Sequence, residues 1–111
     1  MPNTKTPELL PGTLDMLILK TLTRAPNHGY GIAQYIQRVS EDALRIGEGS
    51  LYPALQRLLV NRWVRAEWGT SDTGRKVRIY TITPSGRKQL DAEARDYSYT
   101  IAGIARVMEA I

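Results

Sequence analysis

Apolar residues recur at helical spacing over residues 13–22, near the start of the chain. Leu14, Ile18 and Leu22 form one apolar strip along this predicted helix, and Met16 lies on a second strip. A helix that is apolar on more than one side is usually covered on both sides. We therefore expect it to pack against its own core and against a second subunit. The Pro-Asn-His-Gly sequence that follows predicts a turn.

Two further helices are predicted before the middle of the chain. The first covers 30–39, where apolar residues follow the i, i+3, i+4, i+7 pattern of an amphipathic helix. The second is expected to start with Ser50 as its cap and Pro53 in its first turn, and to end at Asn61 in a left-handed conformation. Between these helices, 44–46 predicts a very short strand.

The next segment has the alternation of a β-hairpin. Apolar and charged residues alternate over 63–68, and 77–83 is rich in β-branched residues. Between them, the sequence Thr-Ser-Asp-Thr-Gly at 70–74 has the composition of a turn. We expect two antiparallel strands, with Trp63 and Trp68 packing in the hairpin or the core rather than stacking on a ligand.

A long helix is predicted at the end of the chain. Pro84 suits the first helical position, and Thr83 before it can cap the helix. The apolar residues of this helix are spaced alternately by four and three, which is a heptad seam for a partner helix. They are Leu90, Ala94, Tyr97, Ile101, Ile104, Met108 and Ile111.

The order of these elements predicts an α+β fold that is mainly α. Three helices followed by a two-stranded hairpin form a winged helix-turn-helix, and the last helix would extend from it for dimerisation. We expect a flexible N-terminal tail over 1–8, a DNA-binding domain over 9–83 and a dimerisation helix over 84–111. In this arrangement the third helix enters the major groove of DNA and the hairpin contacts the backbone or the minor groove.

The charge of the chain is concentrated in its middle third. The net charge is +4 at pH 7, and residues 45–82 carry seven basic and three acidic side chains, whereas the segments on both sides are neutral. A basic block between neutral flanks indicates a surface for a polyanion. The cations at the far end of the predicted hairpin are Arg75, Lys76 and Arg78.

The outer face of the third helix carries side chains that suit DNA. Ser50 and Tyr52 can donate to phosphate or base edges, and Pro53 offers an apolar contact. Gln56 can bind adenine through two hydrogen bonds, and Arg57 can reach guanine or phosphate. The alternatives are a half-buried core position for Tyr52, and a merely solvated surface for the polar side chains of the helix and the hairpin.

Other classes of function find little support in the composition. The chain has no cysteine and one histidine, His28, which we expect in a turn, so neither a metal site nor a catalytic triad can be assembled and no cofactor is expected. The glycines at 47–49 lack the lysine of a phosphate-binding loop. No apolar run approaches the length of a membrane span and no secretory signal is visible, so we expect a cytoplasmic protein associated with the bacterial nucleoid through DNA.

Four stretches of the sequence resemble the PadR family of transcriptional regulators. They are LLPGTLDMLILKTL (9–22), HGYGIAQYI (28–36), IGEGSLYPALQRL (46–58) and RIYTITPSGRKQL (78–90). The resemblance covers most of the chain in order, and it is similar to the short-tailed members with one helix after the wing. The sequence departs from many relatives after the third helix, where it has Asn-Arg-Trp in place of an acidic-Gly turn.

The resemblance implies a dimeric winged-helix repressor that binds double-stranded DNA. Tyr30 would then approach a phosphate, with support of the second helix as the alternative, and the third helix and wing would contact the groove. The first and last helices would form the homodimer. Its interface would contain Leu14, Met16, Ile18, Leu90, Tyr97, Ile101, Ile104 and Met108.

Two alternatives to a plain repressor stay open. In the first, a small apolar or aromatic effector binds at the dimer interface, lined by Tyr97, Tyr99 and a tryptophan, and switches DNA binding. In the second, the winged helix contacts another protein, which would require an apolar third helix and an uncharged wing. The two-fold symmetry of a dimer predicts an inverted-repeat operator, with the two third helices about one helical turn apart.

Overall fold

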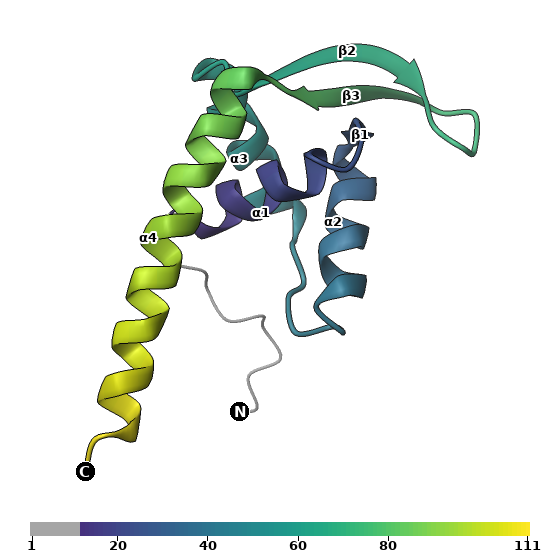
Figure 1. Ribbon diagram of the computed structural model, residues 1–111. Coiled ribbons are helices and arrows are strands. Elements are labelled where there is room, and N and C mark those ends of the chain that lie inside the picture. The colour runs from purple at the N-terminus through teal and green to yellow at the C-terminus, as the bar shows by residue number, and fades with distance from the viewer. Residues whose placement is uncertain (1–11) are drawn as a thin grey trace.

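The computed structural model describes residues 12–111, and the predicted tail at 1–8 lies outside the described residues. Three helices come first, namely α1 (Thr13–Leu22), α2 (Gly29–Val39) and α3 (Glu48–Val60). They pack against one another beneath a β-hairpin, and a long fourth helix stands beside them (Figure 1). The predicted class, mainly α with a small antiparallel sheet, is confirmed.

The apolar strips of the three helices meet in one core. Ile18, Ile32 and Leu58 come from α1, α2 and α3 in turn, and each is fully buried. Burial of one such side chain contributes about 1.5–3 kcal/mol, so these strips fix how the helices pack. The core holds the outer face of α3 in a defined orientation, because Leu51 and Leu55 anchor its opposite side.

The sheet has three strands rather than the two that were expected. The hairpin strands β2 (Val64–Thr70) and β3 (Lys76–Ile82) pair antiparallel, and β1 (Asn27–His28) lies on the other side of β3. The prediction of a turn at this point was wrong, since Asn27 pairs with Tyr80 and His28 with Ile79. Strand β1 therefore ties the start of α2 to the hairpin, which we call the wing.

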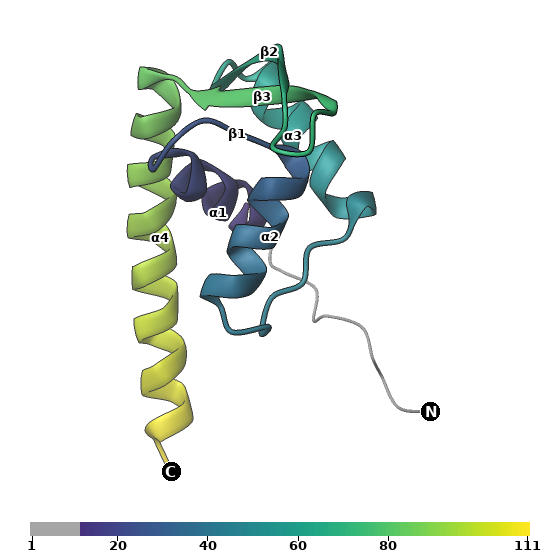
Figure 2. The same ribbon diagram turned by 90° about the vertical axis from the view of Figure 1, so that its right-hand side faces the viewer.

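Helix α4 (Pro84–Glu109) begins as the sequence predicts. The Thr83 hydroxyl accepts a hydrogen bond from the Gly86 backbone N–H at 3.0 Å, and Pro84 occupies the first turn. Gly86 packs closely against the backbone carbonyl of Trp63, so no larger residue fits there without a shift. Leu90 is buried against the core, while the second half of α4 extends beyond the other helices (Figure 2).

Three local predictions near α3 were wrong. Residues 44–46 form no strand. The helix begins at Glu48 with Gly47 as its N-cap, so Ser50 lies inside the helix and does not cap it. At the other end, the left-handed residue is Arg62 with φ 61°, whereas Asn61 is right-handed.

Candidate nucleic-acid interface

The outer face of α3 is exposed along its length. Ser50, Tyr52, Pro53 and Gln56 all lie on the side opposite the buried leucines, as the helical period predicts. The Tyr52 side chain is 49% exposed, so it is neither a core residue nor a freely solvated one. This face presents hydroxyl and amide groups that can reach base edges or phosphates.

Arg57 differs from its neighbours because it is held by another helix. Its Nη2 donates to Oδ1 of Asp15 on α1 at 2.7 Å, and its Nε donates to Oδ2 at 3.4 Å. The hydrogen bond to Asp15 raises the pKa of Arg57, against a smaller lowering by burial. The guanidinium that the sequence suggests for guanine or phosphate is therefore engaged within the chain. Sequence reasoning missed this pair because its members are 42 residues apart.

The start of α2 lies next to α3 and the wing. His28 caps the helix, since its Nδ1 accepts a hydrogen bond from the Gly31 N–H at 3.1 Å. The side-chain oxygen of Asn27 in turn accepts a hydrogen bond from the backbone N–H of His28 at 2.8 Å. These hydrogen bonds stabilise the first turn of α2, which carries Tyr30. The Tyr30 ring is 66% exposed and free to meet a phosphate.

The wing carries an aromatic ring between two cations. Trp68 on β2 pairs with Arg78 on β3, and Thr70 pairs with Lys76. The Lys76 Nζ lies 5.0 Å from the centre of the Trp68 ring and the Arg78 Cζ lies 5.4 Å from it. Such cation–π contacts orient the cations and contribute about 0.5–1 kcal/mol at exposed sites. Trp68 thus contacts the two cations of β3 within the hairpin, while its ring stays 61% exposed.

A groove of about 810 Å³ separates the wing from the starts of α2 and α3. We call it the wing groove, and the tyrosines, the tryptophan and the cations in its lining are Tyr30, Tyr52, Trp68, Arg75, Lys76, Arg78 and Tyr80. Five of these residues were predicted to contact DNA, and Trp68 and Tyr80 were predicted to lie in the hairpin. The structure brings all seven around one channel. The place of Tyr80 at the groove was missed, since in the sequence it reads only as a strand residue.

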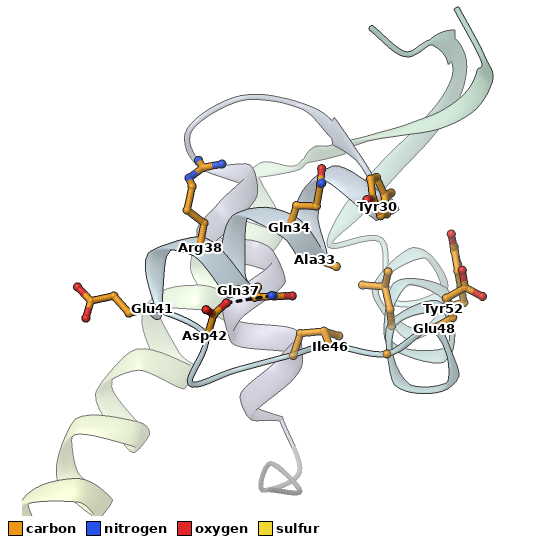
Figure 3. A pocket seen from close by; sticks show the side chains of 12 residues that line it. Tyr30, Ala33, Gln34, Gln37, Arg38, Glu41, Asp42, Ile46, Glu48 and Tyr52 are labelled. Atoms are coloured by element: carbon orange, nitrogen blue, oxygen red, sulfur yellow. Dashed lines mark hydrogen bonds between the residues drawn. The ribbon is translucent and has the colours of Figure 1, made fainter. Parts of the chain in front are cut away.

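A second cleft of about 750 Å³ runs along α2 toward the start of α3. Figure 3 shows Arg38, Glu41 and Asp42 at one end of it and Glu48 with Tyr52 at the other. Glu41 and Asp42 have positive φ values, 54° and 67°, which turn the chain back after α2. Three carboxylates against one guanidinium make this cleft a poor surface for a polyanion, and the wing groove the better one.

The residues expected at a dimer interface fall into two sets. Leu14, Met16, Ile18 and Leu90 are buried in the core of the chain itself, and Ile18 has no exposed surface. For these four, intramolecular packing takes the place of the expected contact with a partner. The other set remains on the surface of α4, 42–78% exposed, and consists of Tyr97, Ile101, Ile104 and Met108.

The tryptophans do not reach the second half of α4. Trp63 packs against the core near the start of α4, and Trp68 lies on the wing. Within the described part of the single chain, the exposed aromatic side chains of α4 are Tyr97 and Tyr99. Within residues 12–111, no three potential ligand side chains gather around a metal position. No helix in this described part has the length and apolar character needed to cross a membrane.

The fold and this surface define a winged helix-turn-helix protein with an extended C-terminal helix. The model of the PadR-like family of transcriptional regulators matches residues 18–92. The chain belongs to this family.

Individual proteins are also similar to this chain. A 37.1 kDa protein of transposon TN4556 from Streptomyces fradiae is 43% identical over 79 residues, which are 71% of this chain and 21% of that protein. The transcriptional regulator Rv3488 of Mycobacterium tuberculosis is 37% identical over 71 residues, 64% of each chain. The chain thus spans about a fifth and about two thirds of these relatives. A transcriptional regulator from Clostridium thermocellum has a similar structure, with a TM-score of 0.78 at 28% identity over 86% of this chain and 92% of that one.

Proposed function

We propose that this PadR-like regulator is a homodimeric repressor that binds an inverted-repeat operator in double-stranded DNA through α3 and the wing. The observation that carries the proposal is the position of the wing cations beside the exposed start of α3 around one groove. A polar helix face next to a basic hairpin suits base reading combined with phosphate contact. On DNA, the protein would lie at the bacterial nucleoid in the cytoplasm.

The roles divide between the two elements. Arg75, Lys76 and Arg78 would supply affinity for any sequence, because phosphates are the same at every step of the duplex. Gln56 would supply discrimination through adenine, with Ser50 and Pro53 beside it on the exposed face. The exposed side of α3 combines Ser50 and Gln56 with the apolar Tyr52, Pro53 and Val60, and it lies next to a basic wing, which favours DNA over a protein partner.

The exposed part of α4 supports the proposal that two copies of the chain form a homodimer. Tyr97, Ile101 and Ile104 stand on one heptad seam and are each more than 40% exposed within the single chain. Large apolar side chains in such a row mark an interaction surface. Pairing of two such helices would cover the seam and set two copies of α3 side by side.

Selection of duplexes from a random pool tests the proposal directly. The purified protein is incubated with random double-stranded DNA, and the bound fraction is amplified and sequenced over several rounds. We expect enrichment of a two-fold symmetric sequence whose half-sites lie about one helical turn apart. Enrichment of an asymmetric site would contradict the dimer, and failure to enrich any sequence would contradict specific binding. Placing the recovered site upstream of a reporter then tests repression.

A further inference from the structure

Tyr80 lies at the floor of the wing groove with an unused hydroxyl. The residue is 7% exposed and lines the groove. Among residues 12–111, no hydrogen bond uses its hydroxyl, and no fully enclosed polar side-chain atom lacks a partner. The hydroxyl therefore opens into the groove. A phenol hydroxyl that is reached from the groove and has no partner among the described residues can donate a hydrogen bond to a ligand held there.

The ladder of the wing places Tyr80 on the same face as the Trp68 cluster. Cross-strand partners share one face of a sheet, and alternate residues along a strand do as well. Tyr80 pairs with Ala66, and Arg78 pairs with Trp68 two residues further along each strand. The side of the hairpin that faces the core at Tyr80 therefore carries Trp68 and Arg78 further toward the hairpin tip. This part of the wing overhangs the helices (Figure 1).

The opposite wall of the groove comes from the starts of α2 and α3. The ring of Tyr52 packs on the backbone of Gly29, where a Cβ would lie only 3.3 Å from its Cε1. Tyr30 continues this wall from the first turn of α2. Both phenols line the same groove as Tyr80, so three phenol hydroxyls and three cations surround it.

Carboxylates also face the groove, and they limit what it can hold. Glu48 from α3 and Asp72 from the turn of the wing line it together with Arg75, Lys76 and Arg78. The groove has three cations and two carboxylates, and all three cations lie on the wing. This balance suits a narrow, extended anion that follows the wing better than a compact, highly charged one.

We propose that the wing groove seats one phosphodiester strand of the DNA backbone, with the Tyr80 hydroxyl donating to a phosphate oxygen and the Trp68 ring packing against the adjoining deoxyribose. The inference rests on the proposed DNA binding and adds the path of the strand to it. When α3 lies in a major groove and the wing in the neighbouring minor groove, one backbone strand must pass between them. Lys76 and Arg78, positioned on Trp68, would bind the phosphates next to that sugar.

Burial supports the role of Tyr80 as a donor. It raises the pKa of the Tyr80 phenol, and nearby Arg78 lowers it by a smaller amount. The hydroxyl therefore keeps its proton throughout the neutral range and donates rather than repelling the phosphate.

The first experiment combines Tyr80→Phe with duplexes that carry one uncharged methylphosphonate in the selected operator. On the natural duplex, we expect Tyr80→Phe to weaken binding about tenfold, the effect of one hydrogen bond to a charged group. When the methylphosphonate replaces the phosphate that Tyr80 contacts, the variant and the wild type should bind equally, because the uncharged group no longer attracts the Tyr80 hydroxyl. Tyr99→Phe, which alters an exposed phenol on α4, should bind as the wild type does.

The second variant is expected to bind DNA more tightly than the wild type, an effect that a loss of folded protein cannot produce. Glu48→Gln removes a negative charge from the groove and should strengthen binding by about threefold to tenfold at low salt. The Trp68 contact is tested in a Trp63→Phe variant, in which Trp68 is the one remaining tryptophan of the chain. Its fluorescence emission should change as operator is added and should reach a plateau once the protein is saturated.

The outcomes separate this inference from the proposed function. If the wild type selects a symmetric operator while Tyr80→Phe and Glu48→Gln bind unchanged, the strand does not lie in the groove and specific DNA binding stands. If Tyr80→Phe loses the same factor at every methylphosphonate position, the groove holds something other than the backbone and the inference is overturned. If the wild type binds no duplex, both proposals fail.

Discussion

Gln56 and Arg57 are neighbours on α3, but their side chains have different surroundings. Gln56 projects from the exposed face without a partner among the described residues, whereas Arg57 is bound to Asp15 on α1. The Asp15 side chain is 13% exposed and Arg57 is 54% exposed, so the pair is screened by water on one side. Such a pair stabilises the fold by about 1 kcal/mol at most. Its larger effect is to keep a cation in a fixed place beside the groove-facing side chains.

Gln56→Ala should therefore change which sequence is preferred, and Arg57→Ala should not. We expect Gln56→Ala to lose about 1–3 kcal/mol of discrimination at one base pair, since it removes two hydrogen bonds to one base. Binding to a panel of operators with single base-pair changes measures this. Arg57→Ala serves as the matched variant, with a similar loss for every operator. A uniform loss with Gln56→Ala would contradict base reading.

Tyr80 also predicts how stability responds to alkaline pH. Burial raises its pKa in the folded chain above the ordinary value of 10.0, at which the unfolded chain ionises. Between the pKa of the unfolded chain and the higher pKa of the folded chain, the folded state binds more protons than the unfolded state. The contribution of Tyr80 to the free energy of unfolding is therefore fully present below about pH 10 and is lost as pH rises through the folded pKa. Tyr80→Phe should lack this fall. Urea unfolding of both proteins at about pH 8 and about pH 11 tests it, and equal losses in the two would refute the assignment.

At the scale of elements, the periodic patterns predict more of the fold than the local signals do. The alternation over 63–68 and the heptads after Pro84 locate the wing and α4 correctly, because each pattern repeats over many residues. β1 is missed because Asn27 and His28 have turn chemistry, and only pairing with distant Tyr80 makes them a strand.

The same limit applies to the candidate site. Its exposed helix face follows from the period of α3, and its wing cations follow from their place at the hairpin tip. The engagement of Arg57 and the position of Tyr80 at the groove depend on contacts between elements far apart in the chain, which no local spacing reports. The sequence patterns thus predict the exposed surface but not the groove within it.

The wing should contribute affinity without sequence preference. Replacing Arg75 and Lys76 by alanine should weaken binding to operator and to random DNA alike, and should reduce the slope of log affinity against log salt by about two. Arg87 and Lys88, a second exposed Arg-Lys pair, lie in the first turns of α4. Their replacement by alanine makes the same change in net charge, so an equal effect from both pairs would mean that overall charge, and not the wing, attracts DNA.

At the scale of the whole molecule, the basic excess and the apolar seam of α4 lie on different parts of the chain. The described residues 12–111 measure 55 × 39 × 21 Å, and the second half of α4 extends away from the wing (Figure 2). The basic excess lies on the wing and around α3, whereas α4 is neutral and carries exposed apolar residues. This separation lets one surface bind a polyanion while the other is covered by a second copy. It also means that α4 can be altered without touching the groove.

The double variant Ile101→Asp with Ile104→Asp should convert the protein to a monomer. It places charges on two adjacent positions of the seam, which are 42% and 48% exposed in the single chain and would be buried in a dimer. An unpaired buried charge costs several kcal/mol, more than a short helical seam supplies. Tyr99→Asp with Ala102→Asp makes the same charge change off the seam and should stay dimeric. Sedimentation equilibrium gives the oligomeric state, and the monomer should bind a half-site as before but lose its preference for the full palindrome. A seam variant that remains dimeric would show that the two copies meet elsewhere.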